Sequence, residues 1–304
     1  MPLKEKPINP EYIHRFDRAT IFEKEGKWLH ALQIYRQLID DFPEEDFAIA
    51  AISNLYEKME HPELGIEILE ECLRGSLDNL PLRLFAGHYF FRQQAWKKTI
   101  ELLAAFSPQD EPIIAFFVGY SYYMINDFQI AKHHFLLYIN LHGEGDFLSD
   151  SFVYLAKACI QLDEYEEALE HLKKAEEVAG DYYELHLLFA IAYYCINMDT
   201  TALQSIKKSI KLNNSDPLVF EWAGRIAFRC GDPKKSISYY TKFLEKGGEI
   251  NADFYANYGM AFLYAKDINS AKKNFDLALS FDPSHSFAKE GLRLINTEYL
   301  AFEK

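Results

Sequence analysis

The sequence has 304 residues, of which 49% are hydrophobic, 15% aromatic and 26% charged, a composition typical of a folded chain with apolar surface to bury. Its formal net charge of −14 disfavours nucleic acid and anionic membranes as partners, because binding to phosphate depends on clustered Lys and Arg. No apolar run approaches the roughly 20 residues of a membrane span, and the first residues lack the apolar stretch of a secretory signal. Four scattered cysteines without a CxxC pair predict neither a disulfide framework nor a zinc scaffold. We therefore expect a soluble, cytoplasmic protein.

A lead over residues 1–11 opens the chain, and in it Asn9, Pro10 and Glu11 suit the N-cap, first turn and dipole of a helix. From residue 12 onward a segment of about 34 residues recurs, and its copies start near residues 12, 46, 80, 112, 149, 183, 217 and 252. Apolar residues recur at helical spacing within each half of a copy. The short polar break between the halves, such as Asp163-Glu164, is long enough only for an antiparallel helix pair.

Three positions of the repeat are restricted in size. Position 8 is small in every copy, in Ala19, Ser53, Gly87, Gly119, Ala156, Ala190, Gly224 and Gly259. Position 20 is also small, in Ala31, Gly65, Thr99, Ala131, Ala168, Ala202, Ser236 and Ala271. Position 24 is large, in Tyr35, Leu69, Leu103, Phe135, Leu172, Ile206, Tyr240 and Phe275. Small residues at positions 8 and 20 let two helices approach closely, whereas a leucine there would overpack them.

This pattern, with Ala278 at position 27 and Pro283 at position 32 of the last copy, resembles the tetratricopeptide repeat over residues 12–285. The resemblance implies an all-α fold, a right-handed α-solenoid of about eight helical hairpins in which neighbours bury what one hairpin cannot. Residues 286–304 are predicted to form a C-terminal capping helix and tail, with Ala288, Leu292, Ile295 and Tyr299 facing the last repeat.

Two copies are irregular. The third ends early, at residues 106–112, and the fourth continues through residues 143–147, where Gly and Pro favour helix ends and turns. Either the superhelix changes pitch near the fourth copy, or the longer loop is a contact surface.

The sequence offers no constellation for catalysis, because it contains no glycine-rich phosphate loop, HExxH or GxSxG motif. His133 and His134 are adjacent on one helix and point about 100° apart, which places them poorly for a shared metal. Cys159, Cys195 and Cys230 recur near the repeat period and are expected to pack as small apolar residues. Acidic runs are expected on solvated helix faces. We therefore predict no enzyme activity, no cofactor and no metal.

In the proteins that this chain resembles, the first helices of the repeats line a concave surface with positions 2, 5, 9, 12 and 13. In the third to seventh copies these positions, with position 6 for Trp222, predict a partner-binding set of Phe91, Arg92, Phe116, Tyr120, Tyr123, Lys157, Leu187, Ile191, Tyr194, Trp222 and Arg225. The set is aromatic, aliphatic and slightly positive, which favours a polypeptide ligand with an apolar stripe and some negative charge. Alternatively, several members are buried between repeats. Position 5 is never Lys and position 9 is Asn only at Asn54, so the carboxylate clamp of some resembling proteins is not expected.

The leading functional prediction is a protein-interaction scaffold that binds a peptide or an amphipathic helix, such as an assembly factor or a chaperone. A second class is a homo-oligomeric structural protein that docks through residues 299–302 or a convex face. An enzyme has no support in the residues, and RNA binding by a related helical repeat conflicts with the acidic charge balance.

Overall fold

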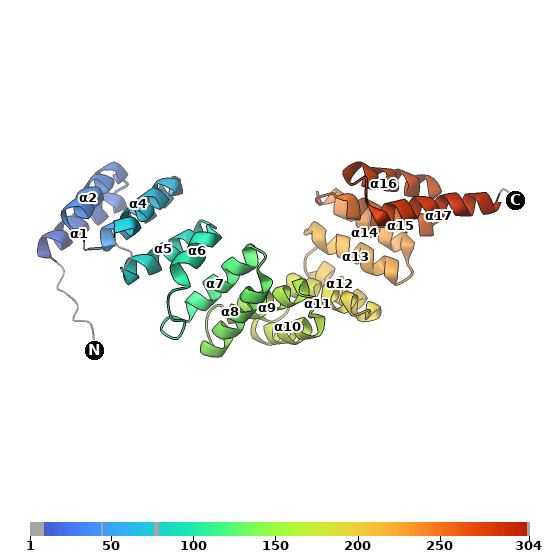
Figure 1. The fold of residues 1–304 in the computed structure, drawn as a ribbon, viewed down its shortest axis with the longest axis horizontal. Coiled ribbons are helices and arrows are strands. Elements are labelled where there is room, and N and C mark those ends of the chain that lie inside the picture. Colours follow the sequence, from blue (N-terminus) through green and yellow to red (C-terminus); the bar gives the residue numbers. More distant parts are fainter. Residues whose placement is uncertain (1–8, 44, 76–78, 303–304) are drawn as a thin grey trace. The chain divides into compact units, whose positions relative to one another are not determined.

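The computed structural model describes residues 9–43, 45–75 and 79–302, and it divides the chain into two compact units, Met1–His142 and Gly143–Lys304. All regular structure among the described residues is helical (Figure 1). The first unit contains α1 (Pro10–Lys24), α2 (Trp28–Asp41), α3 (Phe47–Lys58), α4 (Pro62–Gly75), α5 (Leu80–Arg92), α6 (Trp96–Leu103), α7 (Ile113–Met124) and α8 (Phe128–Leu141). The second contains α9 (Leu148–Gln161), α10 (Tyr165–Ala179), α11 (Tyr183–Cys195), α12 (Asp199–Leu212), α13 (Pro217–Arg229), α14 (Pro233–Glu245), α15 (Ala252–Tyr264), α16 (Ile268–Phe281) and α17 (Ser286–Phe302).

Consecutive helices pair into hairpins, from α1 with α2 to α15 with α16. Within each unit, the second helix of one hairpin packs on the first helix of the next, as α2 does on α3 and α12 on α13. First helices also contact one another, α5 with α7 in the first unit and α9, α11, α13 and α15 in succession in the second. We call the side of each unit formed by its first helices the helix-A face.

The size restrictions read from the sequence hold in the structure. Every residue at positions 8, 20 and 24 is buried. A Cβ atom added to Gly224 would lie 2.6 Å from the ring of Tyr240, and one added to Gly87 would lie 2.3 Å from Leu103. Positions 8 and 24 therefore touch across these hairpins, and a Cβ atom at Gly224 or Gly87 would force the facing side chain to move.

The turn inside each hairpin has a feature that the sequence did not reveal. Position 15 has a positive φ in every copy, between 58° and 79°, at Gly26, Glu60, Gln94, Asn126, Asp163, Asn197, Gly231 and Lys266. Only two of these residues are glycine, although the left-handed conformation disfavours side chains with a Cβ atom. The polar breaks were predicted, but their left-handed backbone was not.

Two tyrosine hydroxyls connect neighbouring hairpins of the first unit. The Tyr12 hydroxyl accepts a hydrogen bond from the backbone N–H of Ala48 at 2.8 Å. The Tyr89 hydroxyl lies 3.2 Å from the carbonyl of Ser53 and 3.3 Å from that of Pro62, and donates to them. Burial raises the pKa of both tyrosines to about 12, so both hydroxyls keep their protons at neutral pH.

The predicted start of the first helix is confirmed, since the Asn9 side chain accepts a hydrogen bond from the backbone N–H of Glu11 at 2.9 Å. At the other end α17 packs on α15 and α16 and buries Ala288 and Ile295, as a capping helix should. The side chain of Tyr299 and residues 303–304 lie outside the described residues, as do residues 1–8 of the lead. The right-handed sense and the limits 1–11, 12–285 and 286–304 stay predictions.

The third copy is short, as predicted. Its second helix, α6, has only 8 residues and ends at Leu103. The chain then turns, with the backbone N–H of Phe106 bonded to the carbonyl of Leu103 at 3.0 Å, and the Arg83 guanidinium lies 5.7 Å from the Phe106 ring centroid. The longer loop at residues 143–147 contains the division between the two units.

Candidate functional site

Four aromatic rings meet on and beside the helix-A face of the first unit. Phe91 at the end of α5 lies 4.4 Å from Phe117 and 5.4 Å from Tyr120 of α7, measured between ring centroids. Trp96, the first residue of α6, lies 5.6 Å from Phe91 and 5.4 Å from Tyr120. All four rings are partly exposed. We call Phe91, Trp96, Phe117 and Tyr120 the first aromatic cluster.

Half of this cluster was absent from the predicted set. Phe117 occupies position 6, the same position from which Trp222 was chosen, so extending that choice to the fourth copy would have found it. Trp96 lies at the start of a second helix, which the positions used for first helices cannot reach. Tyr123, which was predicted, lies one turn further along α7 than Tyr120 and packs its ring 5.4 Å from Phe128 of α8.

Arg92 lies next to the first aromatic cluster and is held by the preceding repeat. Its guanidinium donates to Asn54 Oδ1 and Glu57 Oε2, both at 2.9 Å, and lies 5.2 Å from the ring centroid of Tyr89. Asn54 therefore serves as an internal acceptor for Arg92.

The rings of the second unit are covered by cations. Tyr194 of α11 and Trp222 of α13 meet edge to face at 5.7 Å. The Arg225 guanidinium lies 5.0 Å from the Trp222 centroid, and that of Arg229 lies 3.3 Å from the Tyr194 centroid. All four side chains are partly exposed on the helix-A face. We call Tyr194, Trp222, Arg225 and Arg229 the second aromatic cluster.

The Lys and Arg side chains that were expected to contact a ligand on the helix-A faces each pair with a carboxylate of the chain itself. Arg225 is 2.6 Å from Glu221, and Arg229 donates from Nε to Asp199 at 2.5 Å. Lys157 is 2.5 Å from Glu184, and its Nζ lies 4.5 Å from the ring centroid of Tyr154. With Arg92 paired to Glu57, the slight positive excess expected for the binding surface is neutralised by carboxylates. The structure therefore removes the reason for expecting negative charge on the ligand.

Three members of the predicted set are buried, which corrects the expectation that they face a partner. Phe116 is 5% exposed and packs against Phe135 and Tyr138 of α8. Leu187 is 3% exposed and Ile191 9%, and both belong to the core shared by α11, α12 and α13. The eight residues from 185 to 192 are all buried, because α11 is covered on several sides. A helix that is apolar on all sides is typically buried on all sides. The apolar sequence of α11 therefore indicates its burial better than the repeat positions do.

Two groups of side chains among the described residues bring together donors that suit a metal ion. One consists of Cys159, Glu167 and His171, and the other of Glu176, Asp181 and His186. His133 and His134, the adjacent pair considered from the sequence, are in neither group, and the His134 ring stacks on Tyr122. The sequence expectation of no metal did not anticipate the first group, because its members are on two helices of one hairpin.

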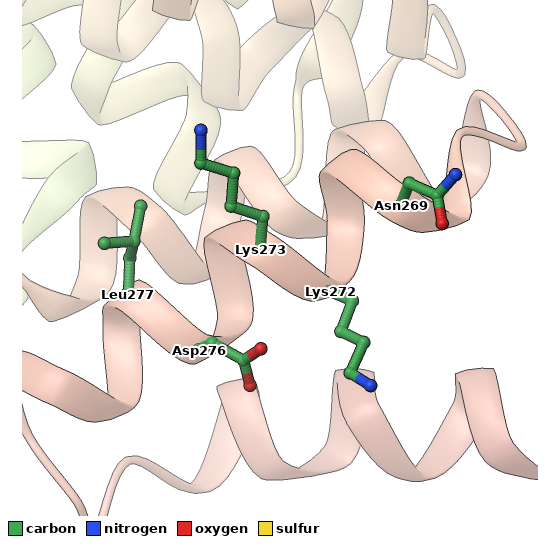
Figure 2. A pocket seen from close by; sticks show the side chains of 5 residues that line it. All are labelled: Asn269, Lys272, Lys273, Asp276 and Leu277. Atoms are coloured by element: carbon green, nitrogen blue, oxygen red, sulfur yellow. The ribbon is translucent and has the colours of Figure 1, made fainter.

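Two depressions on the surface are weaker candidates for a functional site. One lies on α16 and is lined by Asn269, Lys272, Lys273, Asp276 and Leu277, all from a single helix; its two lysines point in opposite directions (Figure 2). Another, of about 450 Å³, lies between α2, α3 and α4 and includes Arg36, whose guanidinium donates to the Tyr56 hydroxyl at 2.6 Å. The first depression contains no hydroxyl or thiol nucleophile. The second includes Cys72, but burial raises the pKa of this thiol and so disfavours the reactive thiolate.

Among the described residues, no helix is both long enough and apolar enough to cross a membrane. This finding concerns membrane-spanning helices alone.

Each unit is a stack of antiparallel helix pairs with partly exposed aromatic rings on its first helices, and stacked helix pairs of this kind define the class of α-solenoid proteins. The tetratricopeptide repeat pattern matches residues 150–182 and 252–285. A TPR repeat-containing protein of Methanocaldococcus jannaschii is 27% identical over 136 residues, which is 44% of this chain and 24% of that protein. The chain thus matches about a quarter of that relative's length.

Solved structures agree on the fold. The Cut9-Hcn1 hetero-tetramer of APC/C matches with a TM-score of 0.57 and 13% identity, over 98% of this chain and 72% of the other. MamA from residue 41 onward, of Desulfovibrio magneticus RS-1, matches with a TM-score of 0.50 and 17% identity, over 56% of this chain and 96% of the other. The resemblance of this chain to tetratricopeptide repeat proteins is thus confirmed in the two matched segments and in the fold.

Proposed function

We propose that this chain is a scaffold that binds apolar side chains of another polypeptide on the helix-A faces of its units. Tetratricopeptide repeat proteins generally act as protein-interaction scaffolds and are generally not catalysts. One observation carries the proposal: each unit has a cluster of partly exposed aromatic rings on its helix-A face.

The energetics favour an apolar partner segment. Burying one large apolar side chain contributes roughly 1.5–3 kcal/mol, and Trp, Tyr and Arg are the residues that most often anchor interfaces. Because the cations near both clusters are already paired, an apolar stripe supplies more of the attraction than negative charge does. The ligand is then an amphipathic helix or an extended segment, as an assembly factor or a chaperone would bind.

The three tryptophans of the chain allow a matched experiment. Trp222 belongs to the second aromatic cluster, whereas Trp28 begins α2, a second helix, and is 39% exposed. We expect Trp222→Ala to weaken retention of the native partner in affinity capture from the source cells by about 30-fold, the effect of losing an interface anchor of about 2 kcal/mol. Trp28→Ala should retain the partner, and circular dichroism should show equal helix content in both variants.

Retention by Trp222→Ala at the wild-type level would remove the second aromatic cluster from the binding surface. Equal loss in both variants would point to general destabilisation. Self-association, the other prediction from the sequence, would place copies of this chain in the captured fraction and would appear as concentration-dependent sedimentation.

A further inference from the structure

The hairpin of α9 and α10 brings three side chains with metal-binding donors together. Cys159 is on α9, and Glu167 and His171 are one turn apart on α10. The thiol sulfur, a carboxylate oxygen and a ring nitrogen all lie within 4.8 Å of one another. Glu167 Oε1 is 3.5 Å from His171 Nε2. Donors in a tetrahedral zinc site are about 3.3–3.8 Å apart, so a movement of about 1 Å would complete the geometry.

The environment of His171 is a second, independent observation. The residue is only 6% exposed, its Nδ1 has no hydrogen-bond partner, and its Nε2 has only the long 3.5 Å contact with Glu167. Buried polar atoms almost always have a partner, because leaving them unpaired costs about 1–3 kcal/mol. The ring stacks on Phe152 at 6.3 Å, which covers the ring face and leaves Nδ1 unsatisfied.

In this hairpin alone, position 11 is a cysteine and position 23 is a histidine. The three donors occupy positions 11, 19 and 23, and in the first three copies positions 11 and 23 carry an aromatic ring and an aliphatic side chain. In the fourth copy position 23 is also a histidine, His134, whose ring stacks on Tyr122 at position 11. Phe22 and Ile34 pack in one core cluster, as do Tyr56 and Ile68, and Phe90 and Leu102. In the fifth copy a thiol and an imidazole replace such an apolar pair at the centre of the hairpin.

The geometry points to a zinc site in which Cys159, Glu167 and His171 hold one Zn²⁺ ion and join α9 to α10. Thiolate, imidazole and carboxylate are the ligands that zinc takes in proteins, and a fourth position is left for water. Binding would release the thiol proton to solvent as the sulfur–zinc bond forms. The side chain of Glu167 is 39% exposed, so the ion would enter past this carboxylate.

The second group of donors lacks these properties. In Glu176, Asp181 and His186, a cation is already present, because Lys208 Nζ lies 2.8 Å from Asp181 and 3.8 Å from Glu176. His186 Nε2 lies 3.0 Å from Asp181 Oδ1, and this hydrogen bond, which the carboxylate accepts, satisfies that nitrogen. This group therefore serves as an internal control.

The test uses the full chain without an affinity tag, stripped of metal and then titrated with zinc chloride by calorimetry and with cobalt chloride by absorption. We expect one zinc per chain, an upward shift in Tm of several degrees with zinc, and the absorption of a cobalt–thiolate bond. Cys159→Ala should lose the cobalt–thiolate absorption, and Glu167→Gln should weaken zinc binding by at least about tenfold. Circular dichroism of each variant without metal checks that the hairpin is folded.

Cys230→Ala, which removes an exposed thiol, and Asp181→Asn, in the second group, should bind zinc as the wild type does. Wild-type protein that takes up no zinc at micromolar concentration would overturn the inference. So would undiminished binding by Cys159→Ala and Glu167→Gln, or loss of binding in Asp181→Asn. None of these results depends on partner capture, so this inference and the proposed scaffold function fail separately.

Discussion

The two aromatic clusters cover their rings in different ways. In the first aromatic cluster, rings pack on rings from α5, α6 and α7, and the nearby Arg92 is held by the preceding repeat. In the second aromatic cluster, guanidinium groups lie over the rings and are themselves held by Glu221 and Asp199. Equivalent positions of one repeat thus give an apolar surface in one unit and a charge-balanced surface in the other. The first should bind through burial alone, whereas the second also depends on the geometry of its arginines.

The largest expected effect tests whether the first aromatic cluster rests on the core. Phe116 is buried beneath it, so Phe116→Ala should lower the free energy of unfolding by about 3–5 kcal/mol, the cost of a cavity left by Phe. Tyr120→Ala should cost much less, because the ring is partly exposed. Urea unfolding followed by circular dichroism measures both. Equal, small losses would mean that Phe116 faces solvent after all, as the position rule predicted.

A smaller effect separates the two arginines. Arg229→Ala removes a partly buried guanidinium from the Tyr194 ring and from Asp199, and should cost about 1–2 kcal/mol. Arg92→Ala removes a side chain that is 45% exposed, and should cost less than about 1 kcal/mol. Chemical denaturation at low and high salt gives both values. If Arg92→Ala costs as much as Arg229→Ala, the proposed difference between the clusters is wrong.

The smallest expected effect lies in the hairpin turns next to each cluster. Gln94→Gly in the first unit should stabilise the chain by about 0.5–1 kcal/mol, since the left-handed strain of a side chain exceeds the added entropy of glycine. Gly231→Ala in the second unit should destabilise it by about 1 kcal/mol for the opposite reason. Asn126→Gly is the control, because asparagine tolerates this conformation and should change stability little. Thermal melts resolve the order, and a loss of stability in Gln94→Gly would show that contacts of the glutamine outweigh its strain.

Much of the fold could be predicted because steric constraints on the repeat are local. Whether Gly224 faces a large residue is decided by the repeat period, and the structure places Tyr240 there. Exposure was harder to predict, because it depends on how many neighbours cover a helix. Leu187 and Ile191 occupy repeat positions that the position rule expects to be exposed. They are buried because α9, α10, α12 and α13 all pack on α11.

The sequence also could not predict which residues form ion pairs with each other. The partner of Arg92 is 35 residues away, close to one repeat, whereas that of Arg229 is 30 residues away. The repeat period therefore does not identify which acidic residue pairs with each arginine. The donors of the proposed zinc site belong to two helices whose relative rotation decides whether Cys159 and His171 meet. Periodicity gives the helices, but the rotation comes from packing.

The hydroxyls of Tyr12 and Tyr89 each reach a backbone group 36 residues away, close to one full repeat. These two bonds tie the second hairpin to the first and to the third at an offset of about one repeat. Adding or removing a whole copy elsewhere in the chain would leave this offset unchanged. An insertion of half a copy would set a first helix where a second belongs and leave these hydroxyls facing the wrong backbone.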